Sequence, residues 1–126
     1  MTTEDAKAFV RRHFEDIVNR QDLIAAEKNF ASDYEEHGDD APFGLQLGPE
    51  GPKQYLATFF RRSPDIQATI EDKIAEGYKV VVRNVWRRRH RKNQQIEFAG
   101  IFVIWRIAGR KLAERWAYLE SPHPVH

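Results

Sequence analysis

The chain has 126 residues, of which 41% are hydrophobic and 31% charged, and its formal net charge is +1. This length suits one domain, and the apolar fraction is high enough for a core, which argues against disorder. Cysteine is absent, so disulfides, thiolate metal sites and a cysteine nucleophile are excluded. The near-zero net charge selects neither nucleic acid nor a membrane as a partner. No apolar run approaches the ~20 residues of a membrane span and the N-terminus is polar, so we expect a cytoplasmic protein.

The first half of the chain predicts helices. Apolar residues recur at three- and four-residue spacing after Glu4, which predicts an amphipathic helix capped by Thr3. Its apolar stripe consists of Phe9, Val10, His13, Phe14, Ile17 and Val18. A shorter helix over about 23–30 follows its cap Asp22, and a third helix is expected over about 50–62.

The second half predicts strands joined by short turns. A short extended piece, 32–37, and a loop rich in Gly and Asp come before the third helix. The expected strands are 66–75, 79–90, 95–107 and 111–120. This order predicts an α+β domain over 1–120, in which N-terminal helices pack on a curved, mostly antiparallel sheet that forms a cone with an internal pocket. Residues 121–126 are expected to be a loose tail.

Several segments, spread over nearly the whole chain, follow one another in an order and spacing typical of one family. They are Asp33–His37, Gly48–Gly51, Ser63–Asp65, Glu71–Gly77, Val80–Arg83, His90, Phe98–Gly100, Ile107–Trp116 and Glu120. In this the sequence resembles the SnoaL-like polyketide cyclase and ester cyclase group of the nuclear-transport-factor-two-like (ketosteroid-isomerase-like) superfamily. The resemblance implies a cone that commonly dimerises through its open sheet face. The same scaffold hosts cyclases, isomerases, dehydratases, hydrolases and binding modules, so the chemistry depends on the site.

Glu120 is the candidate acid/base. The resemblance implies an acidic residue four positions after Trp116, although the family commonly has aspartate there and this chain has the longer glutamate. Strand alternation predicts that Glu120 shares a face with Trp116 and Tyr118, where aromatic neighbours would strip water from the carboxyl and suit it to proton transfer. The alternative is a solvated carboxylate at the end of a strand.

Two histidines are further candidates. His37 ends the extended piece, and an imidazole exchanges protons near neutral pH or donates to a carbonyl oxygen. The alternative is a histidine that satisfies a backbone carbonyl at a loop boundary. His90 lies in the basic run 87–92, which is either a solvated hairpin tip or a substrate-binding rim for carboxylate or phosphate. Nucleic acid is the least favoured ligand, because no RNA-binding aromatic pattern accompanies the run.

Aromatic residues on the expected strands are candidates for substrate binding. Trp86, Trp116 and Tyr118 would form a wall that stacks a flat apolar ligand, with core or dimer-interface packing as the alternative. No histidine pair with metal-ligand spacing and no glycine-rich phosphate loop occurs. We therefore expect neither a metal nor a cofactor.

These patterns, together with the resemblance, predict a small-molecule enzyme that moves a proton next to a carbonyl in a cyclisation or isomerisation. Glu120 would take or give the proton, and His37 would polarise the carbonyl of an apolar, cyclic substrate. A non-catalytic binding module is the alternative, and a hydrolase or dehydratase is a further one.

The expected partner besides the ligand is a second copy of the chain. Strand 95–107 is apolar on both faces, and helices cover only one of them. The interface would be the face with Ile101, Val103 and Trp105, or the alternate face with Phe98, Phe102 and Ile104. No nucleic acid and no membrane is expected as a partner.

Overall fold

The computed structural model describes residues 1–39, 41, 45, 47–89, 92–120 and 123–124. Its helices are α1 (Thr3–His13), the π-helix η1 (Phe14–Asn19), α2 (Ala25–Asn29) and α3 (Glu50–Arg62). Its strands are β1 (Phe30–Glu36), β2 (Gln67–Glu76), β3 (Lys79–Arg89), β4 (Ile96–Ala108), β5 (Lys111–Leu119) and β6 (His123–Pro124).

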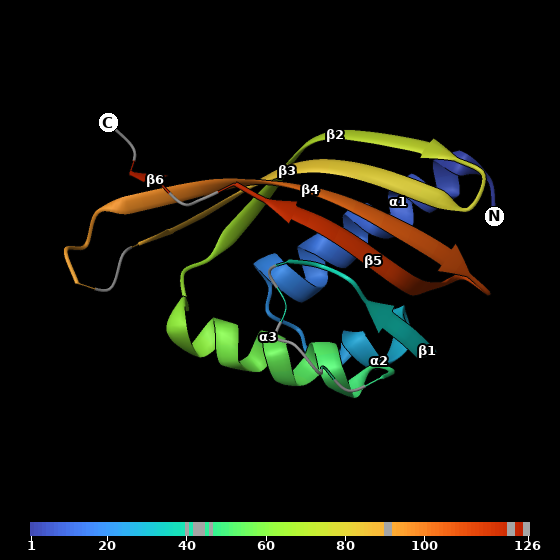
Figure 1. The fold of residues 1–126 in the computed structure, drawn as a ribbon, viewed down its shortest axis with the longest axis horizontal. Helices are drawn as coiled ribbons and strands as arrows, with labels where there is room; N and C mark the ends of the chain where they lie inside the picture. Colours follow the sequence, from blue (N-terminus) through green and yellow to red (C-terminus); the bar gives the residue numbers. More distant parts are fainter. Residues whose placement is uncertain (40, 42–44, 46, 90–91, 121–122, 125–126) are drawn as a thin grey trace.

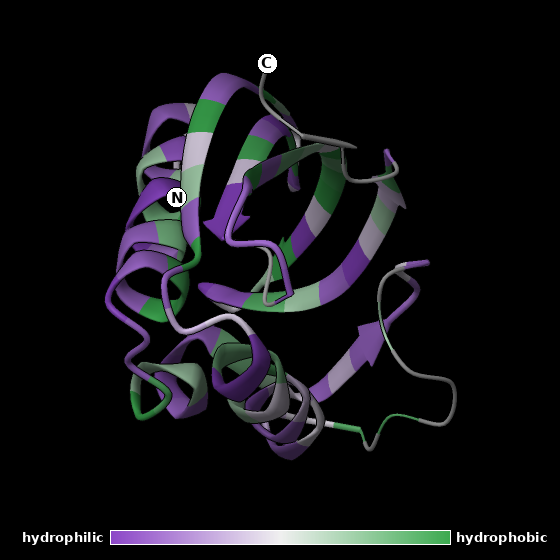
Figure 2. Cartoon of the chain, turned by 90° about the vertical axis from the view of Figure 1, so that its left-hand side faces the viewer, coloured by the Kyte–Doolittle hydropathy of each residue, from purple (hydrophilic) through white to green (hydrophobic). Residues whose placement is uncertain are grey.

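The strands form one bent sheet in the order β1-β5-β4-β3-β2, with β6 paired to β4 (Figure 1). Strands β2 to β5 are an antiparallel meander, and β1 joins the edge of β5 in parallel. The sheet bends over the helices, with α1 along one side and α3 below (Figure 2). The predicted α+β domain with a curved, mostly antiparallel sheet is therefore confirmed. In the expected tail, His123 and Pro124 pair with Phe98 and Glu97.

The first helix begins one residue earlier than the sequence predicts. Thr2, rather than Thr3, is the cap: its hydroxyl accepts a 3.0 Å hydrogen bond from the Asp5 amide, and the Asp5 carboxylate accepts one from the Thr2 amide. Only Thr2 has an acidic residue three positions later in the capping-box arrangement, which satisfies two amides at once. The predicted cap Asp22 is wrong by two residues, because α2 starts at Ala25 and its N-cap is Ile24. The Asp22 carboxylate instead accepts hydrogen bonds from the amides of Ile24 and Ala25 in the turn before the helix.

The core lies between the inner face of the sheet and the helices. On β4, Ile101, Val103 and Trp105 are buried inward, whereas Phe102 is 54% exposed on the other face. The helical stripe predicted from the sequence is buried at Val10, among others, and continues through η1. Alternation along β4 thus separates a packed face from an open one.

His13, in the last turn of α1, is a buried polar member of this core. Its Nδ1 lies 3.2 Å from the side-chain amide of Asn29, and its ring packs edge-on against Phe30 and Trp105. Burial, with a smaller contribution from the Arg115 charge, lowers the pKa of His13 to about 3. The imidazole is therefore neutral at physiological pH.

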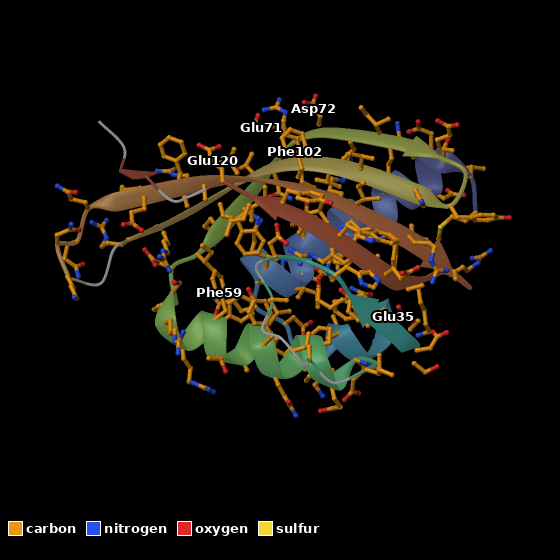
Figure 3. All side chains as sticks on the ribbon, in the orientation of Figure 1. Glu35, Phe59, Glu71, Asp72, Phe102 and Glu120 are labelled. Atoms are coloured by element: carbon orange, nitrogen blue, oxygen red, sulfur yellow. The ribbon has the colours of Figure 1, made fainter. Side chains whose placement is uncertain are left out.

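The outer face of the sheet carries a continuous apolar row across four strands. Ile74, Val81, Ile104 and Trp116 are direct cross-strand neighbours in turn. Phe102 and Tyr118 form a neighbouring pair on the same face, and Phe102 points away from α3 (Figure 3).

None of the helices in the described part of the chain has the length and hydrophobicity that a membrane span requires.

We expect this outer face to join two copies of the chain, because an exposed apolar patch of this kind usually marks an interface. Light scattering at micromolar protein should give twice the mass of the chain. Phe102→Asp should shift the protein toward monomer, because it would bury a charge in the interface. Leu47→Asp removes an exposed apolar side chain outside the sheet and serves as the control. A wild-type monomer at every concentration would rule out this interface.

Acid should destabilise the fold through His13. The unfolded chain binds a proton at the ordinary histidine pKa of about 6.5, whereas the folded chain resists it down to about 3. The free energy of unfolding is therefore unaffected by His13 protonation above about pH 6.5. Between about pH 6.5 and pH 3 it decreases by up to about 1.4 kcal/mol for each unit by which the pH falls. Urea unfolding at several pH values should show a shallower acid slope for His13→Gln than for the wild type. The same replacement at the partly exposed His37 is the control, and equal slopes for the wild type and His13→Gln would contradict the assignment.

Candidate functional site

A cavity of about 290 Å³ lies between the inner face of the sheet, η1 and α3. Its wall is mostly apolar, and its aromatic members are Phe14, Phe30, Tyr34, Tyr55, Phe59, Trp86, Phe98 and Trp105. Such a hollow forfeits packing contacts that a filled core would have, so it weakens the fold that contains it. An apolar pocket of this size with a few polar groups is typical of a small-molecule site.

One polar cluster in the wall is centred on Glu36, at the end of β1. Its Oε2 accepts from Nη1 of Arg115 at 2.9 Å and from the Gly38 amide at 2.9 Å. Its Oε1 accepts from the Tyr34 hydroxyl at 2.8 Å. The Glu36 and Arg115 side chains are only 9% and 10% exposed, so the ion pair is nearly withdrawn from water.

Strand register brings these groups together. Glu36 and Arg115 are direct neighbours in the parallel β1–β5 pair, and Tyr34 precedes Glu36 by two residues and shares its face. The Arg115 guanidinium also lies 5.7 Å from the centre of the Trp105 ring, which is a cation–π distance. The cluster thus places a carboxylate, a cation and a phenol in one apolar wall.

A second pair of opposite charges lines the cavity on β3 and β4. Arg88 Nη1 donates to the hydroxyl of Ser63 at 3.1 Å, and its Nε lies 3.4 Å from the Glu97 carboxylate. Ser63 caps the C-terminal end of α3 and is buried. Arg88 therefore connects the long β3–β4 hairpin to the end of α3.

Trp86 is held rigidly in the aromatic wall. Its Nε1 donates to Oδ1 of the buried Asn84 at 2.7 Å, and its ring packs edge-on against Phe59 at 5.7 Å. Figure 3 places Phe59 on α3, below the sheet. Trp105, also in the wall, has a buried Nε1 with no hydrogen-bond partner among the described residues.

The structure places the predicted substrate-binding residues on different sides of the sheet. Trp86 lines the cavity, and its contact with a substrate stays a prediction. Trp116 and Tyr118 lie on the outer face, because β5 supplies the cavity with Arg115 and Leu119, the residues of opposite phase. His90 lies outside the described residues.

Glu120 shares the outer face with Trp116 and Tyr118 and does not line the cavity (Figure 3). Its amide donates to the Gly100 carbonyl at 2.9 Å, and its carboxylate lies 2.9 Å from where a side chain on Gly100 would begin. The absence of a side chain at Gly100 makes room for this carboxylate. Its predicted role in proton transfer stays a prediction.

His37 also lies outside the cavity wall. Its ring stacks on Trp116 at 5.2 Å, and its Nε2 lies 2.8 Å from the Glu114 carboxylate. Hydrogen bonds from Arg106 and His37 lower the pKa of Glu114. Glu35 completes a group whose ligand atoms lie within 4.8 Å of one another and are close enough to share a cation. Hydrogen bonds and ion pairs within the protein account for this arrangement.

Of the four charged residues in the cavity wall, sequence reasoning missed Glu36, Arg115 and Glu97. The fourth, Arg88, lies in the basic run 87–92, for which a substrate-binding rim is one of the two predictions. Glu36 lies inside a segment singled out for its histidine, and alternation pairs it with the buried Tyr34. The sequence does not single out Arg115, because the larger aromatic residues lie on the other face of its strand and make that face look like the buried one. Knowing that β1 pairs with β5 in parallel would have placed Glu36 beside Arg115, but no local sequence pattern predicts this pairing.

Comparison with known proteins identifies the family and the fold. The family model of the SnoaL-like polyketide cyclases matches residues 8–121. A provisionally assigned polyketide cyclase from Acidithiobacillus ferrooxidans is similar in structure, with a TM-score of 0.84, 20% identity and coverage of 94% of this chain and 91% of that one. No curated protein matches the chain.

Two other similar structures differ in their described activity. A SnoaL-like polyketide cyclase from Agrobacterium tumefaciens has a TM-score of 0.77 and 16% identity, with coverage of 96% of this chain and 93% of that one. AclR from Streptomyces galilaeus, provisionally a hydroxylase, has a TM-score of 0.78 and 17% identity, with coverage of 94% and 81%. At these identities the likeness shows the fold alone.

Removing one partner of the Glu36–Arg115 pair should strongly destabilise the protein. Arg115→Met leaves a buried carboxylate without its cation, which typically costs about 3–5 kcal/mol. The double variant Glu36→Gln with Arg115→Met should recover part of this loss, because no unpaired charge remains. Urea unfolding measures both, and a loss below about 1 kcal/mol in the single variant, as for exposed pairs, would show that the pair is solvated.

Proposed function

Because the chain belongs to the SnoaL-like polyketide cyclase family, we propose that it is a cofactor-independent enzyme that moves protons next to a carbonyl in the apolar cavity. The reaction is a cyclisation or isomerisation of an apolar, cyclic or polyketide-like substrate. The observation that carries the proposal is the buried cluster of Glu36, Arg115 and Tyr34 in the wall of an otherwise apolar cavity.

Glu36 is the group to which we assign proton transfer. The carboxylate would remove a proton from the carbon next to the carbonyl, which leaves an enolate. The enolate carbon then forms a bond to a second carbonyl carbon of the same molecule, and the proton returns to the resulting alkoxide oxygen. Atoms and charge balance, and the product is an isomer of the substrate.

Arg115 and Tyr34 have supporting roles. The guanidinium beside Glu36 would offset negative charge that develops on the substrate oxygen, and its 10% exposure would limit screening by solvent. The Tyr34 hydroxyl holds Glu36 in one orientation through its 2.8 Å hydrogen bond. Such positioning lowers the entropy cost of reaching the reactive geometry.

The cavity also bears on the non-catalytic alternative. Complete filling of the cone by Trp86, Trp116 and Phe102 would have argued against turnover. Trp116 and Phe102 lie on the outer face, and Trp86 lines an open space. Room for a ligand together with a buried carboxylate favours an enzyme over a filled scaffold, although a binding module also needs the room.

The test is incubation with linear and aryl-substituted β-keto esters, followed by chromatography and mass spectrometry. A new product of unchanged mass supports cyclisation or isomerisation. Gain of a water indicates the hydrolase alternative, and loss of a water indicates the dehydratase. A bound but unconverted compound favours the binding module.

Glu36→Gln should reduce turnover per folded molecule about 10²–10⁴-fold, the usual contribution of a general acid–base group. It should also lower the stability of the fold, because the nearly buried Arg115 loses its anionic partner. Asp33→Asn, which removes an exposed charge from the same strand, is the matched control. Circular dichroism checks the fold of both variants. Unchanged turnover in Glu36→Gln together with loss in Glu120→Gln would transfer the role to the residue predicted from the sequence.

A further inference from the structure

Arg88 lies at the exposed end of the cavity wall and is the most accessible charged side chain among those that line it. Its side chain is 38% exposed, against 18% for Glu97 and about a tenth for Glu36 and Arg115. It follows Trp86 by two residues on β3 and so shares the inner face. The solvent-facing end of a ligand that packs on Trp86 would therefore lie beside this guanidinium.

Protein contacts orient the Arg88 guanidinium but do not occupy all of its N–H donors. Nη1 donates to the buried Ser63 hydroxyl at 3.1 Å, and Nε makes only a long 3.4 Å contact with Glu97. Nη2 has no hydrogen bond to a described residue. A guanidinium has five N–H donors. Arg88 is therefore already oriented by the protein and still has N–H groups that a ligand can accept from.

The surrounding charge favours an anion at this end of the domain. The end of α3 and the β3–β4 hairpin are joined here by the Arg88–Ser63 bond and by the bond from the Arg89 amide to Asp65. The described cations of these segments are Arg61, Arg62, Arg87, Arg88, Arg89 and Lys92, and the acids are Asp65 and Glu97. An excess of positive charge raises the local concentration of anionic ligands.

We propose that Arg88 determines specificity by binding an anionic oxygen group, such as a carboxylate, on a ligand whose apolar body fills the cavity. The inference rests on the proposed function for the use of the cavity and adds the class of ligand. Charge-assisted bonds from a guanidinium to an oxyanion are among the stronger hydrogen bonds, and their geometry is directional. Glu97 then acts as the competing internal anion that the ligand displaces or shares.

The test uses two fluorescent probes of similar apolar shape. Anilinonaphthalene sulfonate carries an anionic oxygen group, and N-phenylnaphthylamine is neutral. Arg88→Gln should weaken binding of the sulfonate about tenfold, equivalent to about 1.4 kcal/mol, and leave the neutral probe unchanged. Glu97→Gln should have the opposite sign and strengthen sulfonate binding several-fold, because the competing carboxylate is removed.

Arg87→Gln is the matched control, since it makes the same charge change one residue away on the outward, exposed side of β3. If Arg87→Gln and Arg88→Gln weaken the sulfonate equally, the effect is general electrostatics and the proposal is wrong. If the neutral probe binds but no variant changes the ratio of the two affinities, the proposal is wrong while the cavity stands. If neither probe binds the wild type, both this proposal and the ligand-binding cavity of the proposed function are overturned.

Discussion

The ion pair between Arg115 and Glu36 is the interaction on which the arrangement of the site depends. It joins the only parallel strand of the described sheet, β1, to β5, and it does so at the wall of the cavity. Two nearly buried charges of this kind are costly apart and tolerable together, so the pair favours one register of β1 over its neighbours. The same register brings Tyr34 to the carboxylate and keeps Arg115 over Trp105.

The ion pair lines a cavity, which allows it a chemical role in addition to its structural one. In a filled core the charges would be a structural feature alone, but here they face a cavity of about 290 Å³ with an aromatic wall. Charges that are nearly buried in such a wall are weakly screened, so this carboxylate and cation would act strongly on the carbonyl compound that we propose as substrate. The neutral, buried His13 supports the wall from behind through its edge-on contact with Trp105.

The two faces of the sheet differ in burial, and β5 illustrates how hard they are to distinguish from the sequence. Arg115, Ala117 and Leu119 alternate with Trp116, Tyr118 and Glu120, so each face carries one charged residue and two apolar ones. The larger aromatics favour the wrong face for the cavity on hydrophobicity alone. The open face instead carries the cross-strand apolar row that we expect to contact a second copy.

From the sequence alone follow the helices, the antiparallel meander and the α+β class. These depend on local periodicity, capping and turns, which neighbouring residues determine. The tertiary structure alone decided which face of β5 looks inward and that β1 pairs with it in parallel. Residues 36 and 115 are far apart in the chain, and alternation along a strand defines two faces without saying which is buried. Only packing of the whole domain determines which face is buried, and therefore which charged groups line the cavity.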